Sequence, residues 1–499
     1  MNIHGSGSHH AALLTVASAF FLEVLDATIM IVAIIPLADD LGASISGVTL
    51  ALAAYLLALV VFTPASGHLF KTLGLAQRFQ CGLLILCLAS LACASSQNLY
   101  MLCIARLAQG FGSALIVPAG RTLILANTDK DQIPRIMAWL IAPALVAPIV
   151  APSIANVLLS LGNWRLIFGF IAFCAAGLIA ICRATLFALP APAARQHPFD
   201  VYAYGLWALS SSALFTMFVA GSNSRPLYTL LAAIVMLYAG VRLYQRLCQA
   251  TDKQLFDLSL LNNPLFKFNI VSGSFFRISI YAFPTVLIIH LLKTSDYPPS
   301  SIGHCLLFIF AGNLLAKPVA ARILANSHSI KRYFLYSALA TSITLSVFFY
   351  PRLSDPLPVL WLACALHGCA RSFQFLGYSS SSLRDIQPSR MHHANILLGA
   401  VMQHNALIAQ AVPALLAAFL IPSRLPGESS DGFFNLGMTT VTALSLMAVV
   451  SALRMPNSSR QGSPPSTASP TNVKAGNHTH SSVVTQGAED ESREAENHR

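Results

Sequence analysis

Two carboxylates, Glu23 and Asp26, lie deep inside a long apolar stretch near the N-terminus, unlike the other acidic residues of the chain. Residues three apart share one face of a helix, so the two groups are expected to be neighbours. Burial and mutual repulsion both disfavour two negative charges there. A carboxyl group that can gain and lose a proton near neutral pH is what proton coupling requires. A purely structural ion pair is the alternative.

Three arginines, Arg106, Arg277 and Arg371, also fall inside apolar segments. A charge at the centre of a membrane helix costs about 2.5–3.5 kcal/mol on insertion scales, so these side chains should face the protein interior or water. At about 1.5 Å per residue, Arg106 and Asp26 reach a similar depth, and pairing is feasible. Arg106 could bind an anionic substrate, or hold the Asp26 carboxylate charged until a proton or substrate displaces it. A static pair remains the alternative.

Other chemistries lack the residues they need. The sequence contains no phosphate-cradling GxxxxGK[ST] motif, and no Ser/His/Asp or metal-ligand set with convincing spacing. Its cysteines fall mostly within apolar runs and include no CxxC pair, which is typical of packing residues. We therefore expect that the protein is not an enzyme and binds no metal or cofactor, and that a proton gradient is its energy source.

The elements that position these residues must be solvated by lipid. Hydrophobic residues make up 55% of the chain and charged residues 10%, with a mean hydropathy of +0.65. A soluble protein needs about 25% charged residues to cover its surface. The net charge of +11 comes from basic residues scattered singly between apolar runs, which indicates membrane orientation rather than nucleic-acid binding.

Apolar runs of about 20 residues, the length that spans a bilayer, predict an all-α polytopic membrane protein. The short gaps between runs make neighbouring helices antiparallel. The predicted helices are 11–38, 47–70, 79–96, 99–125, 136–159, 165–189, 200–220, 227–247, 268–292, 301–322, 333–350, 357–380, 394–421 and 434–454.

Loop charge predicts the orientation of these fourteen helices. With the N-terminus in the cytoplasm, most Lys and Arg residues between the helices lie on the cytoplasmic side, as the positive-inside rule requires. The basic residues expected on the opposite side are Arg165, Arg225, Lys293, Arg352 and Arg424. We expect a multi-pass protein of the cell (inner) membrane with both termini cytoplasmic.

A weak internal repeat predicts the domain organisation. Pro64 precedes Arg78 by the same interval at which Pro318 precedes Arg332, and both pairs follow the second helix of a six-helix block. This pattern fits two six-helix bundles, residues 1–199 and 268–455, separated by an inserted helix pair and loop at 200–267. The polar tail at 456–499 carries too little apolar mass to fold and is expected to be disordered and cytoplasmic.

The fifth predicted helix carries Pro143, Pro148 and Pro152 among small residues. Prolines remove backbone hydrogen bonds and bend a helix, and small residues let a neighbouring helix approach closely. The segment is interpreted as a pivot, with a merely kinked helix as the alternative.

These segments resemble the major facilitator superfamily, and specifically its fourteen-helix drug:proton antiporter branch, over about residues 15 to 455. Residues 25–29 (LDATI) resemble the LDxTI signature of the first helix, and residues 106–114 (RLAQGFGSA) match the fourth-helix pattern RxxQGxGxA closely. The fifth helix is similar to the antiporter motif, and Asn395 and Gln403 sit where this branch often has them. The resemblance implies substrate and proton coupling for Asp26 and Arg106, and a role in export for Pro148 and Pro152. We expect the coupling site to comprise Glu23, Asp26, Arg106 and Gln109.

The sequence departs from the family pattern at two places. The loop after the second helix keeps Gly67, Gly74 and Arg78, for which we expect a conformational role, but Lys71 occupies the usual position of an Asp that latches two helices. In the fifth helix, alanines replace the usual glycines at positions 147, 151 and 155. These changes weaken the inference of antiport.

The sequence thus favours a secondary active transporter that exports small hydrophobic or amphipathic compounds by proton-coupled alternating access, as in multidrug efflux. The alternatives are a uniporter or importer of a specific metabolite, or a non-transporting degenerate family member. Its expected partners are a small-molecule substrate, protons and the lipid bilayer, without nucleic acid, and the expected state is a monomer.

Overall fold

The computed structural model describes residues 4–70, 72–128, 132–187, 189, 199–222, 225–249, 255–294, 299–327, 329–349, 357–387, 390–420 and 429–455. The predictions made for Lys71 and for the tail at 456–499 lie outside the described residues. The described part is helical almost throughout, so the predicted all-α class is confirmed.

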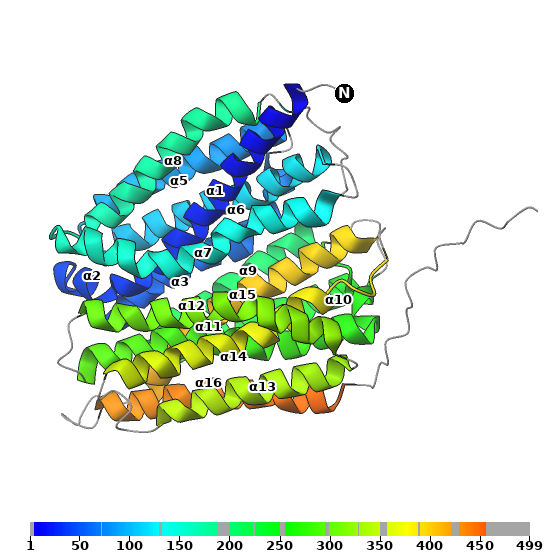
Figure 1. The fold of residues 1–499 in the computed structure, drawn as a ribbon. Coiled ribbons are helices and arrows are strands. Elements are labelled where there is room, and N and C mark those ends of the chain that lie inside the picture. The colour runs from blue at the N-terminus through cyan, green and yellow to red at the C-terminus, as the bar shows by residue number, and fades with distance from the viewer. Residues whose placement is uncertain are drawn as a thin grey trace, which may run out of the picture. The chain divides into compact units, whose positions relative to one another are not determined.

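Long helices coincide with all of the predicted segments (Figure 1). The α-helices are α1 (His4–Val32), α2 (Ile34–Asp40), α3 (Ile45–Phe62), α4 (Ser66–Leu69), α5 (Leu75–Ala94), α6 (Leu99–Ala126), α7 (Ile133–Ser160), α8 (Arg165–Thr185), α9 (Val201–Ser222), α10 (Pro226–Cys248), α11 (Pro264–Thr294), α12 (Pro299–Asn326), α13 (Ile330–Ser346), α14 (Leu357–Ser381), α15 (Met391–Leu420) and α16 (Ser429–Leu453). Two short 3₁₀ helices, η2 (Leu258–Asn262) and η3 (Val347–Phe349), complete the described elements.

Two predicted helices are each divided in two, because proline interrupts them. The segment 11–38 is broken between α1 and α2, where Pro36 has no amide hydrogen to donate to the carbonyl of Val32. The segment 47–70 is divided between α3 and α4, because Pro64 removes the corresponding bond to Val60. Both breaks follow from the same missing donor.

Among the described residues, ten helices are long and apolar enough to cross a membrane, and Gly47–Phe62 and Val146–Ser160 are shorter apolar helices. The outward faces of these helices are apolar. On α10, for example, Leu230 is 59% exposed and Leu237 is 66% exposed. Such side chains would be unfavourable in water but are well solvated by lipid tails.

The helices before and after the α9–α10 pair pack chiefly among themselves (Figure 1). In the first set, α1 contacts α7 and α8, while α5 and α6 contact each other and also reach α8 and α3. In the second set, α12 packs on α14, α11 packs on α15 and α16, and α13 packs on α14 and α16. The two sets meet where α7 contacts α12 and where α3 contacts α15. We call this boundary the seam.

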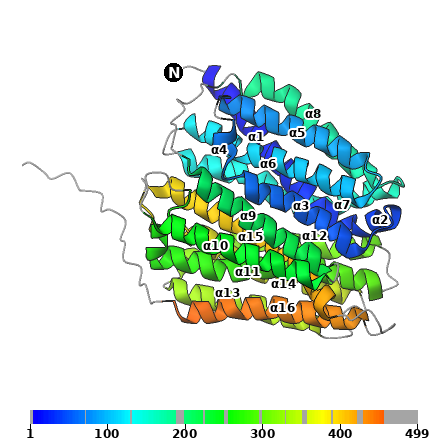
Figure 2. The same ribbon diagram turned by 180° about the vertical axis from the view of Figure 1, so that it is seen from behind.

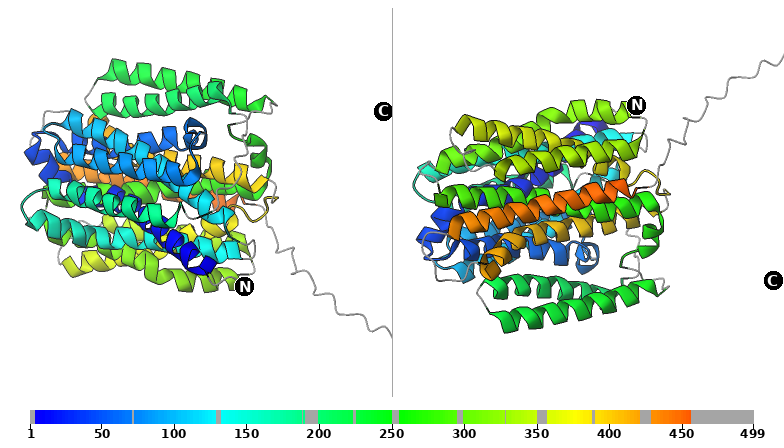
Figure 3. Two further views of the ribbon diagram at one scale, coloured as in Figure 1. Left: turned by 90° about the horizontal axis from the view of Figure 1, so that it is seen from above. Right: turned by 90° about the horizontal axis from the view of Figure 1, so that it is seen from below.

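Helices α9 and α10 pack against each other along one side of the remaining helices (Figures 2 and 3). Helix α9 also contacts both α3 and α15, so it lies against the two sides of the seam. The indole Nε1 of Trp207 donates to the carbonyl oxygen of Val60 at 3.0 Å, and its ring centroid lies 4.5 Å from that of His404. Asp200 caps α9 by accepting from the amide of Ala203, and it pairs with Arg246 of α10 at 2.9 Å.

At one end of the bundle, Asp40 joins the end of α2 to the start of α8. Its Oδ2 accepts from Arg165 Nη1 at 2.7 Å and from Trp164 Nε1 at 3.0 Å, and Arg165 also donates to the carbonyl oxygen of Ser96. The hydrogen bonds from Arg165 and then Trp164 lower the pKa of this exposed carboxylate below its usual value.

Helices α12 and α14 approach so closely that glycine is required at their contact. A Cβ at Gly368 would overlap the backbone carbonyl oxygen of Ile309, and one at Gly312 would overlap that of Ala365. Because both obstacles are backbone atoms, neither can move aside without shifting a helix.

Protonation of Asp40 should weaken the contact between α2 and α8. A carboxylate whose pKa is lowered on folding stabilises the protein above its unfolded pKa of about 3.9, and this stabilisation is lost as the pH falls through the lowered value. We therefore expect Asp40→Asn to lower the melting temperature at neutral pH, and the difference from wild type to vanish in acid. Asp39→Asn, at the exposed neighbouring position, makes the same chemical change and is the control, with no change in melting temperature expected at neutral pH.

Replacing Gly368 by alanine should separate α12 from α14. We expect a loss of about 1–3 kcal/mol in the free energy of unfolding from overpacking, although alanine favours a helix by about 1 kcal/mol over glycine. The matched control is Gly177→Ala on α8, where an added Cβ meets nothing within 4 Å. Denaturant titration in mixed micelles measures both, and equal effects would contradict the close approach.

Candidate substrate and proton site

A buried ion pair joins α1 to α6. Arg106 Nη1 donates to Asp26 Oδ2 at 2.7 Å, and both residues are 0% exposed. The pairing that the predicted depths made feasible is therefore present. Because each charge offsets the other, the pair can remain in a region where either charge alone would be costly.

The guanidinium of Arg106 is also held by a polar network that reaches α5. The same Nη1 donates to Gln109 Oε1 at 2.8 Å, and Gln109 Nε2 donates to Ser90 Oγ at 2.8 Å. The thiol of Cys93 donates to Gln109 Oε1 at 3.2 Å. Gln109 is 0% exposed, so its amide serves as a buried relay between the ion pair and α5.

Aromatic rings cover the guanidinium from two further helices. The Cζ of Arg106 lies 4.4 Å from the ring centroid of Tyr55 on α3 and 6.0 Å from that of Phe168 on α8. The hydroxyl of Tyr55 donates to Ser113 Oγ at 3.0 Å. Gly110 permits this arrangement, because a Cβ there would overlap the carbonyl oxygen of Tyr55. Cation–π contacts of this kind are strongest when water is excluded.

The ion pair keeps two unused hydrogen-bonding positions. Asp26 Oδ1 and Arg106 Nε are buried and have no hydrogen-bond partner among the described residues. An unpaired carboxylate oxygen is a place where a proton can bind, and an unpaired guanidinium N–H is a place where an acceptor can bind. The geometry therefore allows the pair to exchange partners without unfolding any helix.

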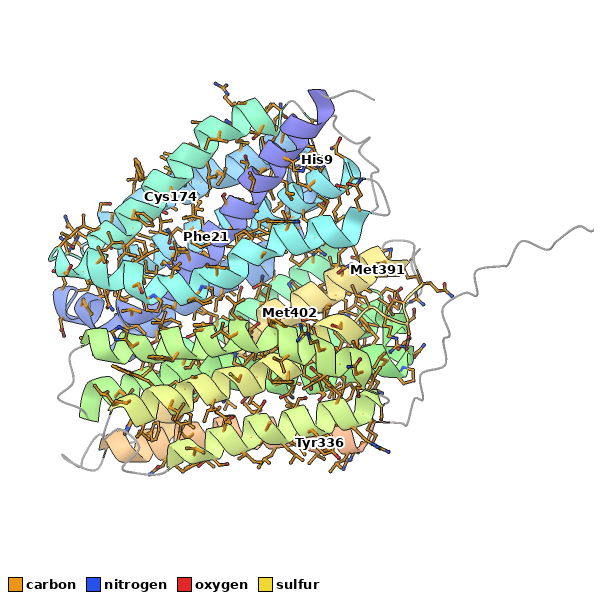
Figure 4. The ribbon with its side chains drawn as sticks, in the orientation of Figure 1. His9, Phe21, Cys174, Tyr336, Met391 and Met402 are labelled. Atoms are coloured by element: carbon orange, nitrogen blue, oxygen red, sulfur yellow. The ribbon has the colours of Figure 1, made fainter. Side chains whose placement is uncertain are left out.

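Glu23 lies one helical turn before Asp26 on α1 and is partly exposed. It interacts electrostatically with Asp26 and with Tyr55. The structure thus places Glu23 beside the ion pair but does not include it in the pairing. Figure 4 draws the side chains of these helices, with Phe21 marking α1.

The loop after α3 is closed by Arg78. Its Nη1 donates to the carbonyl oxygen of Gly67 at 3.0 Å, and its Nε donates to that of Leu73 at 2.9 Å. Gly74 caps α5 and donates its amide to Gln77 Oε1 at 3.0 Å. The three predicted loop residues therefore lie together in the loop between α3 and α5, and none of these hydrogen bonds involves the ion pair.

Helix α7 continues through its prolines and lies between α1 and α12. Ala147, Ala151 and Ala155 are all 0% exposed, four residues apart, and so form one packed face. Pro152 lies 3.9 Å from where a Cβ at Gly303 of α12 would be, so it reaches the seam, while Pro148 is partly exposed.

The remaining predicted residues do not join the ion pair. Arg277 and Arg371 are buried on α11 and α14, within the second helix set. On α15, Asn395 donates to the carbonyl oxygen of Met391 in its own helix, and Gln403 is partly exposed. Neither α15 residue contacts the predicted site in the described part of the chain.

Sequence reasoning missed Tyr55, Ser90 and Cys93, which complete the surroundings of Arg106 and Gln109. Ser113 was within the RLAQGFGSA segment and could have been singled out by its spacing, since it lies one turn after Gln109. The other three lie on α3 and α5 in apolar contexts, where nothing distinguishes them from packing residues.

Comparisons with known proteins place this geometry in context. A family model described as Major Facilitator Superfamily matches residues 16–410. A relative from Cronobacter sakazakii with the provisional name multidrug resistance protein MdtD is 27% identical over 449 residues, which cover 89% of this chain and 94% of the relative. Relatives of the same name from Enterobacter sp. and Pectobacterium carotovorum are 24% identical over 447 and 450 residues, covering 89% of this chain and 94% and 96% of theirs.

Solved structures show a similar fold. A mutant of the peptide transporter POT has a TM-score of 0.64 at 15% sequence identity, covering 89% of this chain and 94% of that one. The same transporter in complex with sulfate has a TM-score of 0.64 at 14% identity, with the same coverage. At these identities the similarity concerns the arrangement of helices.

Breaking the ion pair should have unequal effects from its two sides. In Asp26→Asn the guanidinium of Arg106 is left without a counter-charge and cannot lose its proton, so we expect a loss of about 3–5 kcal/mol in the free energy of unfolding. In Arg106→Gln the carboxyl group can become neutral by binding a proton, so the loss should be smaller. The double variant should be more stable than Asp26→Asn alone. Additive losses in this double-mutant cycle, measured in mixed micelles, would show that the two residues do not interact.

Proposed function

Because the chain belongs to the Major Facilitator Superfamily of membrane transporters, and is thus a multi-pass membrane protein rather than an enzyme, we propose that it exports small hydrophobic or amphipathic compounds in exchange for protons. The observation that carries the proposal is the buried pair of Asp26 and Arg106, with the carboxyl group of Glu23 one turn away. A proton-coupled transporter has to move protons through a region where lipid cannot solvate charge, and a buried carboxyl group beside a guanidinium could take part in that step.

Proton binding at Asp26 changes what Arg106 can do. Once the carboxyl group is neutral, the ionic part of the attraction between α1 and α6 is gone, and Arg106 keeps only neutral partners, which include Gln109 and the aromatic rings. The freed guanidinium can then turn toward another acceptor. Glu23, which is partly exposed, supplies a second carboxyl group through which the proton reaches or leaves Asp26.

The proposed movement is a rocking of two six-helix bundles, residues 1–199 and 268–455, about the seam. The packing supports this division, because the helices of each set contact mainly one another and meet along α7–α12 and α3–α15. The prolines of α7 are points at which the helix can bend, and its face of small alanine side chains lets it slide against a neighbouring helix. Protonation then selects between two arrangements that differ in energy by only a few kcal/mol.

Gly67, Gly74 and Arg78 would fix the loop that links α3 to α5 during this movement. Arg78 holds two backbone carbonyls of the loop, so α3 and α5 are tied together even though the segment between them contains glycine. We assign this loop a conformational role, distinct from substrate binding.

Multidrug export is favoured over other cargo by the relatives whose provisional name is multidrug resistance protein, although these are only 24–27% identical. The excess of basic residues on one set of loops supports a cytoplasmic location for both termini in the cell membrane. We further propose that one chain suffices for transport, since the ion pair is completed by residues of a single chain.

Everted membrane vesicles test the coupling. After acidification of the vesicle interior, addition of a transported compound should let protons out, which a pH-sensitive dye reports. A panel of hydrophobic cations, anions and neutral compounds should include some that do this with the wild-type protein. Asp26→Asn should reduce the response to that of vesicles without the protein, because the residue can no longer exchange a proton, and Glu23→Gln should slow it.

The matched control is Asp39→Asn, which makes the same chemical change at an exposed position and should transport normally. Accumulation that survives a protonophore would reject proton coupling, and full activity of Asp26→Asn would reject the role given to that carboxyl group. Uptake into intact cells, rather than into everted vesicles, would indicate an importer.

A further inference from the structure

Two buried arginines in the second helix set have no counter-charge among the described residues. Arg277 is near the middle of α11 and is 3% exposed, and Arg371 is near the middle of α14 and is 5% exposed. A third cation, Lys317 of α12, is partly buried and interacts electrostatically with Arg371. We refer to these three residues as the cationic cluster.

Acidic residues are missing from the helices that surround the cluster. The sequences of α11, α12, α13, α14 and α15 contain no Asp or Glu, and the single acidic residue of α16 is Asp431 in its first turn. The four ion pairs among the described residues all use other arginines. Arg106 therefore has a carboxylate partner in its helix set, whereas Arg277 and Arg371 have none among the residues that the structure describes.

The guanidinium groups also lack neutral partners. Arg277 Nη1 and the Nε and Nη1 atoms of Arg371 are buried, and no hydrogen-bond acceptor in the described part of the chain satisfies them. Buried N–H groups of this kind are normally paired, and a charged one left unpaired is especially costly. Three unsatisfied donor atoms on two buried arginines of the same helix set therefore offer positions where an acceptor could bind.

Aromatic rings surround the cluster and connect its members. Tyr281 of α11 interacts electrostatically with both arginines. The Cζ of Arg277 lies 5.8 Å from the ring centroid of Tyr378, and that of Arg371 lies 5.1 Å from the ring centroid of Phe310. The surroundings thus combine unpaired guanidinium N–H groups with apolar and aromatic surface, which suits a ligand that has a charged head and a hydrophobic body.

We propose that the cationic cluster binds the anionic head of the transported compound, a carboxylate, sulfonate or phosphate joined to a hydrophobic group. A guanidinium presents two parallel N–H groups that match two oxygens of such a head, and the pairing is strongest where water is excluded. The proposal rests on the proposed export function and narrows its substrate class. A lipophilic cation at the cationic cluster would instead meet three positive charges, and the helices α11 to α15 carry no carboxylate that could offset its own charge.

The same chemistry could come from a soluble amphiphile or from the head of an anionic lipid. Binding to purified protein in phosphatidylcholine nanodiscs separates the substrate class from transport, because no gradient is needed. The probes are 1-pyrenebutyrate and its trimethylammonium counterpart, which share the aromatic body and differ in the sign of the head. Signal from empty nanodiscs is subtracted from each.

We expect the wild-type protein to bind pyrenebutyrate at least about tenfold more tightly than the cation, which corresponds to one charge-assisted hydrogen bond. Arg277→Gln and Arg371→Gln should each remove most of this preference, whereas Arg277→Lys and Arg371→Lys should keep part of it because the charge remains. The control is Arg322→Gln on α12, an exposed position where no change is expected.

Stability distinguishes a binding role from a structural one. Since neither guanidinium has an anionic partner, the two glutamine variants should melt no lower than the ligand-free wild-type protein. A lower melting temperature in both, or pyrenebutyrate binding that is unchanged in both, would overturn the proposal. If either glutamine variant cannot be purified, the lysine variants still decide, because loss of two-point donation should weaken anion binding and leave cation binding unaffected.

Added phosphatidylglycerol identifies the source of the ligand. If a lipid head occupies the cluster, this lipid should weaken pyrenebutyrate binding to the wild-type protein and co-purify with it but not with Arg371→Gln. If a soluble amphiphile is the ligand, phosphatidylglycerol should neither weaken pyrenebutyrate binding nor co-purify with the wild-type protein.

Transport of the trimethylammonium probe without any binding of pyrenebutyrate would overturn the anionic assignment and leave the proposed export function standing. Binding of pyrenebutyrate without proton-coupled movement of any compound would overturn the proposed export function and leave the anionic assignment of the cationic cluster standing.

Discussion

Hydrocarbon cannot solvate an isolated charge, and the first helix set is arranged around a buried pair of opposite charges that offset each other. Asp26 and Arg106 neutralise each other at 2.7 Å, and the surrounding helices supply what remains. Helix α5 provides Ser90 through Gln109, α3 provides the ring of Tyr55, and Gly110 allows α3 to come near enough for that ring to cover the guanidinium. The close packing of these helices therefore brings together the groups that surround the Arg106 guanidinium.

The second helix set meets the same constraint in a different way. Its close helix contact, between α12 and α14, again depends on glycine facing backbone, but its buried arginines have no carboxylate beside them in the described residues. The interior is thus electrically asymmetric across the seam, near neutral on one side and positive on the other. An asymmetry of this kind orients any polar molecule that lies between the two sets.

The positions of the helices could be predicted from sequence because a membrane span is a local property of about 20 residues. The breaks at Pro36 and Pro64 were equally local, yet they lie inside continuous apolar runs, so composition alone concealed them. Only some of the partners of Arg106 could be predicted from the sequence. Asp26 could be identified because acids are rare at such depth, whereas Ser90, Cys93 and Tyr55 acquire meaning only when three helices pack together. The depth of Arg277 and Arg371 was evident in the sequence, but their lack of a partner was not.

The hydrogen bond from the indole of Trp207 has a further consequence for helices α9 and α10. Four residues after Val60 the chain has Pro64, which offers no amide hydrogen, so the Val60 carbonyl cannot be satisfied within its own helix. Trp207 of α9 supplies the missing donor. A chain that lacked α9 and α10 would leave the Val60 carbonyl oxygen without this donor. Helix α9 therefore satisfies a backbone acceptor of α3, the helix that it packs against.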